Sequence, residues 1–431
     1  MRELENKIKP IFFQMWAWAV LVICILWVFI FKVPETSSII WYSWLILIIA
    51  TIMWIFMAMS IWANDVANNM WPAVWSKALT LAWAIIIAAL FEAGWAIIAG
   101  SDVVDTIKWW IIDSSQIQDP AIIINIMLST LIWAVIWVSF ATFSKAPVSA
   151  THSILWALMW AWIVSAWSID VVQWGKVFQI FLSWVISPVM WWVIAVLIFL
   201  SIRHTILKKH SIWQAAKVWV PVFVWIMAWV FTTYLILKWL KSLISKHESL
   251  SFITPSMSLF IWFIFWVIIY LTLRLHYNKK EKWFFQDSKD FVNRLFNIPL
   301  VFAVALLSFA HWANDVANAI WPLAAINEIL MSWKASVDSV WIPLWIMVLW
   351  WLSIATWLMI FGSRLIKAVW SWITKFNQVR AYSLALSAAI TVLIASHLWL
   401  PVSSTHIAIW WIFWIWFLRE FIKHSHWKDK E

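Results

Sequence analysis

Residues 62–72 read WANDVANNMWP and residues 312–322 read WANDVANAIWP, so one block of sequence occurs twice in the chain. A second block is repeated in the same order, because residues 147–152 read PVSATH and residues 401–406 read PVSSTH. The copies of the first block are offset by 250 residues and those of the second by 254. Two blocks repeated in the same order at nearly the same offset indicate an internal duplication rather than chance similarity.

The sequence around these blocks has the composition of a membrane protein. Of its 431 residues, 65% are hydrophobic and only 12% are charged. Soluble domains carry about 25% charged residues, so this composition excludes a soluble enzyme and a disordered tail. The net charge of +10 does not indicate a nucleic-acid partner, because the basic residues form short clusters between apolar runs, as membrane loops do. The single cysteine, Cys24, excludes an internal disulfide framework.

Apolar runs of about 20 residues or more predict helices that cross a bilayer. We count about twelve such segments, at 11–31, 39–61, 73–99, 121–145, 148–167, 176–201, 216–239, 256–275, 298–320, 341–362, 381–400 and 403–422. The sequence therefore predicts an all-α polytopic membrane protein.

The distribution of basic residues predicts the orientation of these segments. If the runs alternate and the N-terminus is cytoplasmic, 23 of the 30 lysines and arginines fall on the cytoplasmic side. This agrees with the positive-inside rule and predicts a multi-pass protein of the cell (inner) membrane. The first block ends the second segment and its copy ends the ninth, so the two copies face opposite sides of the membrane. Inverted repeats with broken helices and hairpins are typical of alternating-access transporters.

The duplication also predicts how the chain is divided. Residues 1–38 form an additional N-terminal anchor helix, and residues 39–201 form the first repeat. Residues 202–297 contribute connecting helices and a cytoplasmic loop, and residues 298–425 form the second repeat.

The first block carries oxygen ligands within an apolar run. On a helix its carboxylate and two carboxamides share one face, because they are spaced three and four residues apart. Such a set suits a small cation, and charged residues inside a membrane usually mark an ion or substrate path. We predict substrate-site roles for Asn64, Asp65, Asn68, Asn314, Asp315 and Asn318, with Asn64, Asp65, Asn314 and Asp315 as ligands of a coupling cation. The alternative is a pair that caps a helix at the membrane interface. Pro72 and Pro322 are expected to break or kink each helix.

The second block reads as the start of a helix, with a proline followed by hydroxyl side chains. A helix start offers free backbone N–H groups and a positive dipole end, which suit an oxyanion. The predicted hydroxyl donors are Ser149, Thr151, Ser403, Ser404 and Thr405. His152 and His406 could assist as neighbouring donors or proton carriers, although a hydrogen-bonded structural role is the simpler interpretation for each.

Donors for an anion beside carboxylates imply cotransport. The carboxylates repel a bare anion unless a cation or proton enters too, so anion affinity and cation occupancy become linked. A carboxylate also accepts a hydrogen bond from the P–OH group of hydrogen phosphate, whereas sulfate has no hydrogen to donate. We therefore predict import of inorganic phosphate coupled to Na⁺ or H⁺, with no cofactor and no catalytic residues. The lipid bilayer is the expected surrounding, and a homodimer is compatible with this prediction.

At these residues the chain resembles the inorganic phosphate transporter family, the sodium- or proton-coupled phosphate permeases. The family hallmark GANDVANA is matched by WANDVANN at 62–69 and WANDVANA at 312–319, and its PVSTTH block by residues 147–152 and 401–406. The stretch from Phe91 to Lys108 is similar to the family's third-helix region, where Glu92 is expected to support the site. The resemblance covers about residues 40–425 and implies that both pairs of blocks hold phosphate and the coupling ion. A sulfate permease, a membrane-embedded hydrolase and a non-transporting sensor are the alternatives.

One feature departs from that family. The chain has 47 tryptophans and only 4 glycines, and tryptophan stands where the family has glycine, as at positions 62, 71, 312 and 321. The tryptophans also occur in the middle of the apolar runs, so they do not form an interfacial belt. We hypothesise that most of them are glycines in the cell, encoded by UGA in an organism that reads this codon as glycine.

Overall fold

The computed structural model of the chain describes residues 41–88, 90–91, 111–112, 116–143, 148–236, 254–279, 289–334 and 377–398, with short pieces between 343 and 353 and at 402–403. The side chains of residues 61–67 and 312–319 lie outside this description. The helices are α2 (Trp41–Trp75), α4 (Pro120–Phe143), α5 (Ala150–Ala166), α6 (Trp174–Ile202), α7 (Ile212–Leu235), α9 (Pro255–Lys279), α10 (Lys289–Leu295), α11 (Asn297–Ser332) and α13 (Gln378–His397). Short 3₁₀ and π turns at Ile169–Val171 and Arg203–Leu207 flank α6.

The described residues contain no β-strand beyond one isolated bridge between Ile112 and Val172. The all-α prediction is therefore confirmed. Several helices begin after a side chain whose oxygen accepts a backbone N–H of the first turn, which satisfies a donor that the helix itself leaves unpaired. These caps are Asp119 before α4, Ser149 before α5, Ser211 before α7, Thr254 before α9 and Asn377 before α13.

Five helices in the described part of the chain are long and apolar enough to cross a membrane, within α2, α4, α6, α7 and α13. A sixth is possible if α10 and the first part of α11, which meet at 44°, form one bent span. Helix α5 has 17 residues and so is about 25 Å long, which is shorter than a bilayer core of about 30 Å. The remaining predicted segments fall partly or wholly outside the described residues, so the count of twelve and the division into repeats stay predictions.

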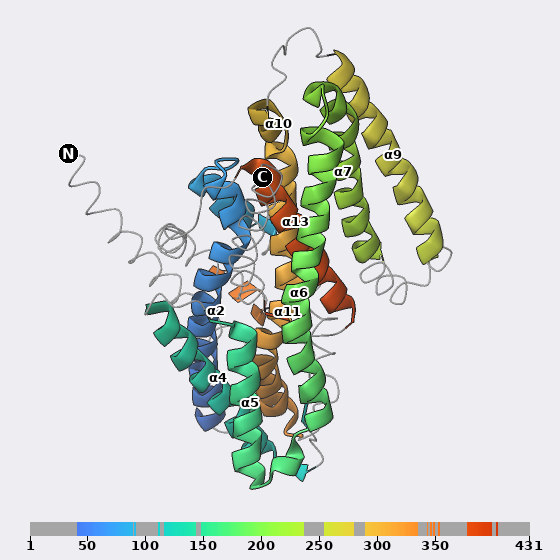
Figure 1. The fold of residues 1–431 in the computed structure, drawn as a ribbon. Coiled ribbons are helices and arrows are strands. Elements are labelled where there is room, and N and C mark those ends of the chain that lie inside the picture. The colour runs from blue at the N-terminus through green and yellow to red at the C-terminus, as the bar shows by residue number, and fades with distance from the viewer. Residues whose placement is uncertain are drawn as a thin grey trace, which may run out of the picture.

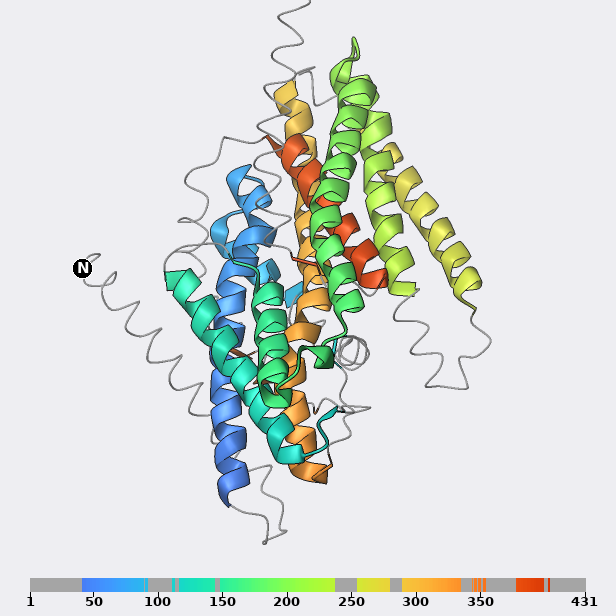
Figure 2. The same ribbon diagram turned by 60° about the horizontal axis from the view of Figure 1, so that its bottom comes forward.

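The helices form an elongated bundle around α11, which packs against α2, α4, α5, α7 and α13 (Figure 1). Of the apolar stretch of α13, 78% is buried, against 28% for α6, so α13 is an interior helix and α6 exposes much apolar surface to the membrane. Helix α9 packs against α7 at the outer edge of the bundle, as Figures 1 and 2 show.

The two Asn–Asp blocks do not break their helices. Helix α2 runs through Pro72 to Trp75, and α11 runs through Pro322 to Ser332. Of the expected break or kink, the break was therefore wrong at these positions. A proline inside a helix cannot donate to the carbonyl four residues earlier, but a helix packed on several sides tolerates the loss of one bond.

Two tryptophans occupy a backbone conformation that favours glycine. Trp167 ends α5 with φ 51° and ψ 26°, and Trp333 ends α11 with φ 51° and ψ 34°. Left-handed residues at the ends of helices are usually glycine, because other residues place Cβ against the neighbouring carbonyl. Among described residues other than glycine, only Lys77 shares a positive φ with them.

Other tryptophans are buried without a partner for the indole N–H. Trp162, Trp321 and Trp345 are 1–3% exposed, and their Nε1 atoms have no hydrogen-bond acceptor among the described residues. A buried polar group left unpaired costs about 1–3 kcal/mol, so indoles buried in proteins normally find an acceptor. Both the backbone and these burial sites are therefore unfavourable for tryptophan.

Candidate functional site

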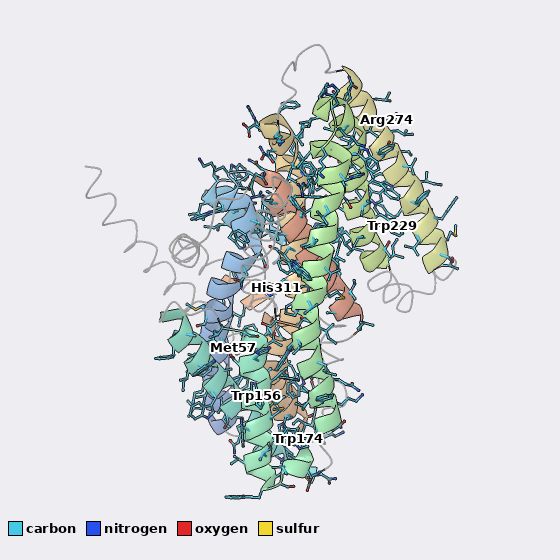
Figure 3. The ribbon with its side chains drawn as sticks, in the orientation of Figure 1. Met57, Trp156, Trp174, Trp229, Arg274 and His311 are labelled. Carbon is cyan, nitrogen blue, oxygen red and sulfur yellow. The ribbon has the colours of Figure 1, made fainter. Side chains whose placement is uncertain are left out.

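The helices that carry the two Asn–Asp blocks lie side by side and run in opposite directions. Helix α2 packs against α11, and their antiparallel course is visible in both views (Figures 1 and 2). A hydrogen bond of 2.9 Å joins Nδ2 of Asn69, within the first copy of the Asn–Asp block, to Nδ1 of His311, which directly precedes the second copy. Both side chains are buried, and Figure 3 places His311 midway along the bundle.

This bond fixes the level at which the blocks meet. Asp65 lies four residues before Asn69, and Asp315 lies four residues after His311. Because the helices are antiparallel, both steps lead in the same direction by about 6 Å, one helical turn. The backbones of Asp65 and Asp315 therefore lie at the same level of the bundle, as do the blocks around them. Of the predicted site residues in these blocks, Asn68 has a described side chain, which is buried.

The two Ser/Thr–His blocks also meet. Helix α5 begins at Ala150, and Ser149 before it accepts a hydrogen bond of 3.2 Å from the backbone N–H of His152. The hydroxyl of Thr151 donates to the carbonyl of Val402 at 3.4 Å, and this contact between residues 251 positions apart joins the two copies of the Ser/Thr–His block. Ser149, Thr151 and Ser403 are all buried. A serine oxygen that accepts a cap bond can still donate its own hydrogen, so Ser149 keeps the ability to contact an anion.

Helix α5 connects the two kinds of block, because it packs against both α4 and α11. Its N-terminal turn lines a groove of about 890 Å³ between α4 and α5, to which Ser149, His152 and Ser153 contribute. Four tryptophans also line this groove, at positions 133, 137, 156 and 160, and Figure 3 shows Trp156 on α5. The ring of His152 lies 3.5 Å, between centroids, from that of Trp184 on α6, which agrees with a structural role for this histidine.

A second cavity, of about 760 Å³, lies between α7, α9 and the start of α11, and its lining is apolar except for Thr232. The hydroxyl of Thr232 already donates to the carbonyl of Ala228 and accepts from the indole of Trp266. This cavity therefore offers nothing that would bind a small oxyanion.

Several predicted site residues fall outside the description. These are the side chains of Asn64, Asp65, Asn314, Asp315 and Asn318, and the whole of Glu92, Ser404, Thr405 and His406. Their roles stay predictions. In the described part of the chain, no group of three or more His, Cys, Asp or Glu side chains could hold a metal ion.

Sequence reasoning missed Asn69 and His311. A signal for both was present, because each is a polar residue beside an Asn–Asp block in an otherwise apolar run. They were overlooked because the copies of the block differ at this position, with Asn69 in the first and Ala319 in the second.

The sequence of the chain is similar to those of known phosphate transporters. Residues 61–420 match the model of the phosphate transporter family. A protein of Helicobacter pylori described as a candidate phosphate permease is 44% identical over 383 residues, covering 88% of this chain and 70% of the relative. A Pyrococcus abyssi protein with a similar description is 34% identical over 363 residues, covering 84% and 86%.

A solved structure is also similar. A sodium-dependent phosphate transporter superposes with a TM-score of 0.77 at 31% identity, covering 87% of this chain and 90% of that one. The resemblance seen in the sequence is thus confirmed, and so is the prediction that this is not an enzyme, because the family is one of transporters. The chain belongs to the phosphate transporter family, a family of multi-pass membrane proteins.

Proposed function

We propose that the chain imports inorganic phosphate by secondary active transport and that Na⁺ is the coupling cation. The observation that carries this proposal is the meeting of both pairs of blocks, through the Asn69–His311 and Thr151–Val402 contacts. Each of these contacts joins residues from the two halves of the chain. The sodium-dependent phosphate transporter of similar structure supports the choice of cation.

In this proposal the Ser/Thr–His blocks bind the phosphate and the Asn–Asp blocks bind the cation. The hydroxyls of Ser149, Ser403, Ser404 and Thr405, with the N-terminal turn of α5, donate to the phosphate oxygens. Thr151 has one hydroxyl hydrogen, so it donates to phosphate only when its bond to the carbonyl of Val402 opens. Asp65 and Asp315, with Asn64, Asn68, Asn314 and Asn318, hold the cation. Carboxylates so close to the anion would repel it, and bound Na⁺ removes this repulsion. Phosphate affinity therefore rises with Na⁺ occupancy, and the reverse follows by linkage.

Uptake of radiolabelled phosphate into proteoliposomes tests the proposal. The full chain is prepared twice, once as printed and once with glycine at every tryptophan whose codon is UGA. We expect accumulation driven by an inward Na⁺ gradient in the glycine version, with sulfate at equal concentration competing poorly. If uptake does not depend on Na⁺ but is lost when the proton gradient is removed, the coupling cation is H⁺ and not Na⁺. If sulfate competes equally with phosphate, the protein is a sulfate permease.

Asp65→Asn provides the decisive variant, since it keeps the shape of the side chain and removes its charge. It should abolish Na⁺-driven uptake while membrane insertion is retained. Asp170→Asn is the matched control, because Asp170 is an exposed carboxylate outside both blocks and its loss should leave uptake unchanged. Full uptake by Asp65→Asn would overturn the assignment, and phosphate binding without flux would indicate a sensor.

A further inference from the structure

The buried hydrogen bond between the two Asn–Asp blocks is present at one end of the blocks only. It joins Asn69 and His311, which are 1% and 3% exposed. An amide nitrogen can only donate, so Nδ1 of His311 accepts with the side chains placed as they are, and the imidazole carries its proton on Nε2. The bond thus holds the first copy of the Asn–Asp block against the residue that precedes the second copy.

The internal repeat shows what stands at the opposite end. The offset of 250 residues relates Asn69 to Ala319 and His311 to Ile61. Ile61 and Ala319 each lie four residues from Asp65 and Asp315, on the side away from Asn69 and His311. In the antiparallel pair of helices their backbones therefore lie level with each other at the opposite end. Neither an alanine nor an isoleucine side chain can form a hydrogen bond. The equivalent bond therefore cannot form.

Inverted repeats exchange their surroundings when a transporter changes the side to which it opens. A contact between two repeats in one conformation passes to the equivalent residues in the other. We propose that Asn69 and His311 are a positioning pair that acts as a one-sided latch, which stabilises the conformation of this structure over the conformation open to the other side. This proposal rests on the proposed function, because only an alternating-access transporter has the second conformation.

The chain supplies the variants that test the latch. Asn69→Ala and His311→Ile replace each residue by its equivalent in the other repeat. Loss of a bond made in one state shifts the equilibrium by about tenfold. The apparent affinity for phosphate should therefore fall on one face of the membrane and rise on the other, when measured in right-side-out and inside-out vesicles. His311→Asn, whose carbonyl can replace Nδ1 as the acceptor, should restore much of the difference.

Two comparisons separate the latch from a general loss of structure. The double variant should resemble the stronger single variant, because both remove the same bond. Ser60→Ala removes a hydrogen bond of 2.9 Å to Ser139 that joins α2 to α4, within one repeat, and should not shift the two faces in opposite directions. Parallel changes on both faces, or additive effects, would overturn the latch.

Absence of uptake by the glycine version would refute the proposed function and the latch with it. Amide hydrogen exchange, which needs no uptake, shows whether the latch alone fails. Both single variants and the double variant should speed exchange over residues 61–75 and 305–320 to the same extent. Unchanged exchange there would overturn the latch.

A separate set of observations leads us to infer that positions 162, 167, 321, 333 and 345 hold glycine in the cell. Positions 167 and 333 have the left-handed backbone, and the other three bury an indole N–H with no acceptor among the described residues. Glycine resolves both problems, since it has no Cβ and no polar side-chain atom. Position 321 also precedes the proline that closes the second copy of the Asn–Asp block.

Sequencing the gene and measuring the mass of peptides from the native protein test this inference. We expect UGA codons at the five positions and peptide masses that correspond to glycine. UGG codons, or peptide masses that correspond to tryptophan, would overturn it.

Discussion

Replacing Trp167 and Trp333 by glycine should stabilise the protein, although each change removes a large apolar side chain. A residue other than glycine in the left-handed conformation costs about 1–2 kcal/mol. Glycine loses more backbone entropy on folding, which reduces the stabilisation by about 0.5–1 kcal/mol. Trp167 is 92% exposed, so its removal sacrifices little packing. The backbone N–H of Trp333 that bonds to Ile329 is kept in either variant.

The net gain is therefore on the order of 0.5–1 kcal/mol for each site. In a chain of 431 residues the double variant should melt about 1–2 °C higher, because the entropy of unfolding grows with chain length. Thermal unfolding in detergent at a fixed scan rate measures this shift.

Trp160→Gly is the matched control for the same measurement. It is an exposed tryptophan inside α5, where glycine costs about 1 kcal/mol of helix propensity, so its melting temperature should fall. If the double variant falls as the control does, the left-handed backbone at the two helix ends carries no strain, and the reasoning is refuted.

Three further outcomes are expected. Thr151→Val, which keeps the shape but removes the hydroxyl that contacts Val402, should raise the phosphate KM about tenfold, as one lost donor to an anion would, with little change in melting temperature; an unchanged KM would remove Thr151 from the site. Trp162→Phe should cost less than about 1 kcal/mol in chemical unfolding, because removal of the unpaired N–H offsets most of the cavity that the smaller ring leaves; a loss of about 3 kcal/mol or more would show that this N–H has an acceptor. Asp315→Asn should abolish Na⁺-driven uptake as Asp65→Asn does, and activity retained in one variant only would show that the two blocks are not equivalent.

The helices could be predicted from the sequence where apolar runs are uninterrupted. The expected run at 176–201 is α6, and the run at 256–275 is α9, with small differences at the ends. Hydropathy alone decides such segments, because a helix is the one open structure that satisfies its own backbone in a bilayer. That the two repeats contact each other could be predicted only from the duplication of the blocks, and not from hydropathy.

The rest depended on packing that no local pattern encodes. Pro72 suggested a broken helix, but α2 continues past it because neighbouring helices support it. The Asn69–His311 bond joins residues 242 positions apart, so the sequence could not show that they meet. The ends of α5 and α11 carry no visible glycine signal, since tryptophan stands where glycine would mark the cap.

If UGA encodes the left-handed ends of α5 and α11, as inferred above, it also decides which cells can use this gene. A codon that specifies glycine in one cytoplasm is a terminator in most others, so a bacterium that acquired the gene would release a truncated peptide. Phosphate uptake through this protein would then stay confined to lineages that share the same decoding rules. Helix-capping glycines that are encoded by a reassigned codon would thus act as a barrier to horizontal gene transfer.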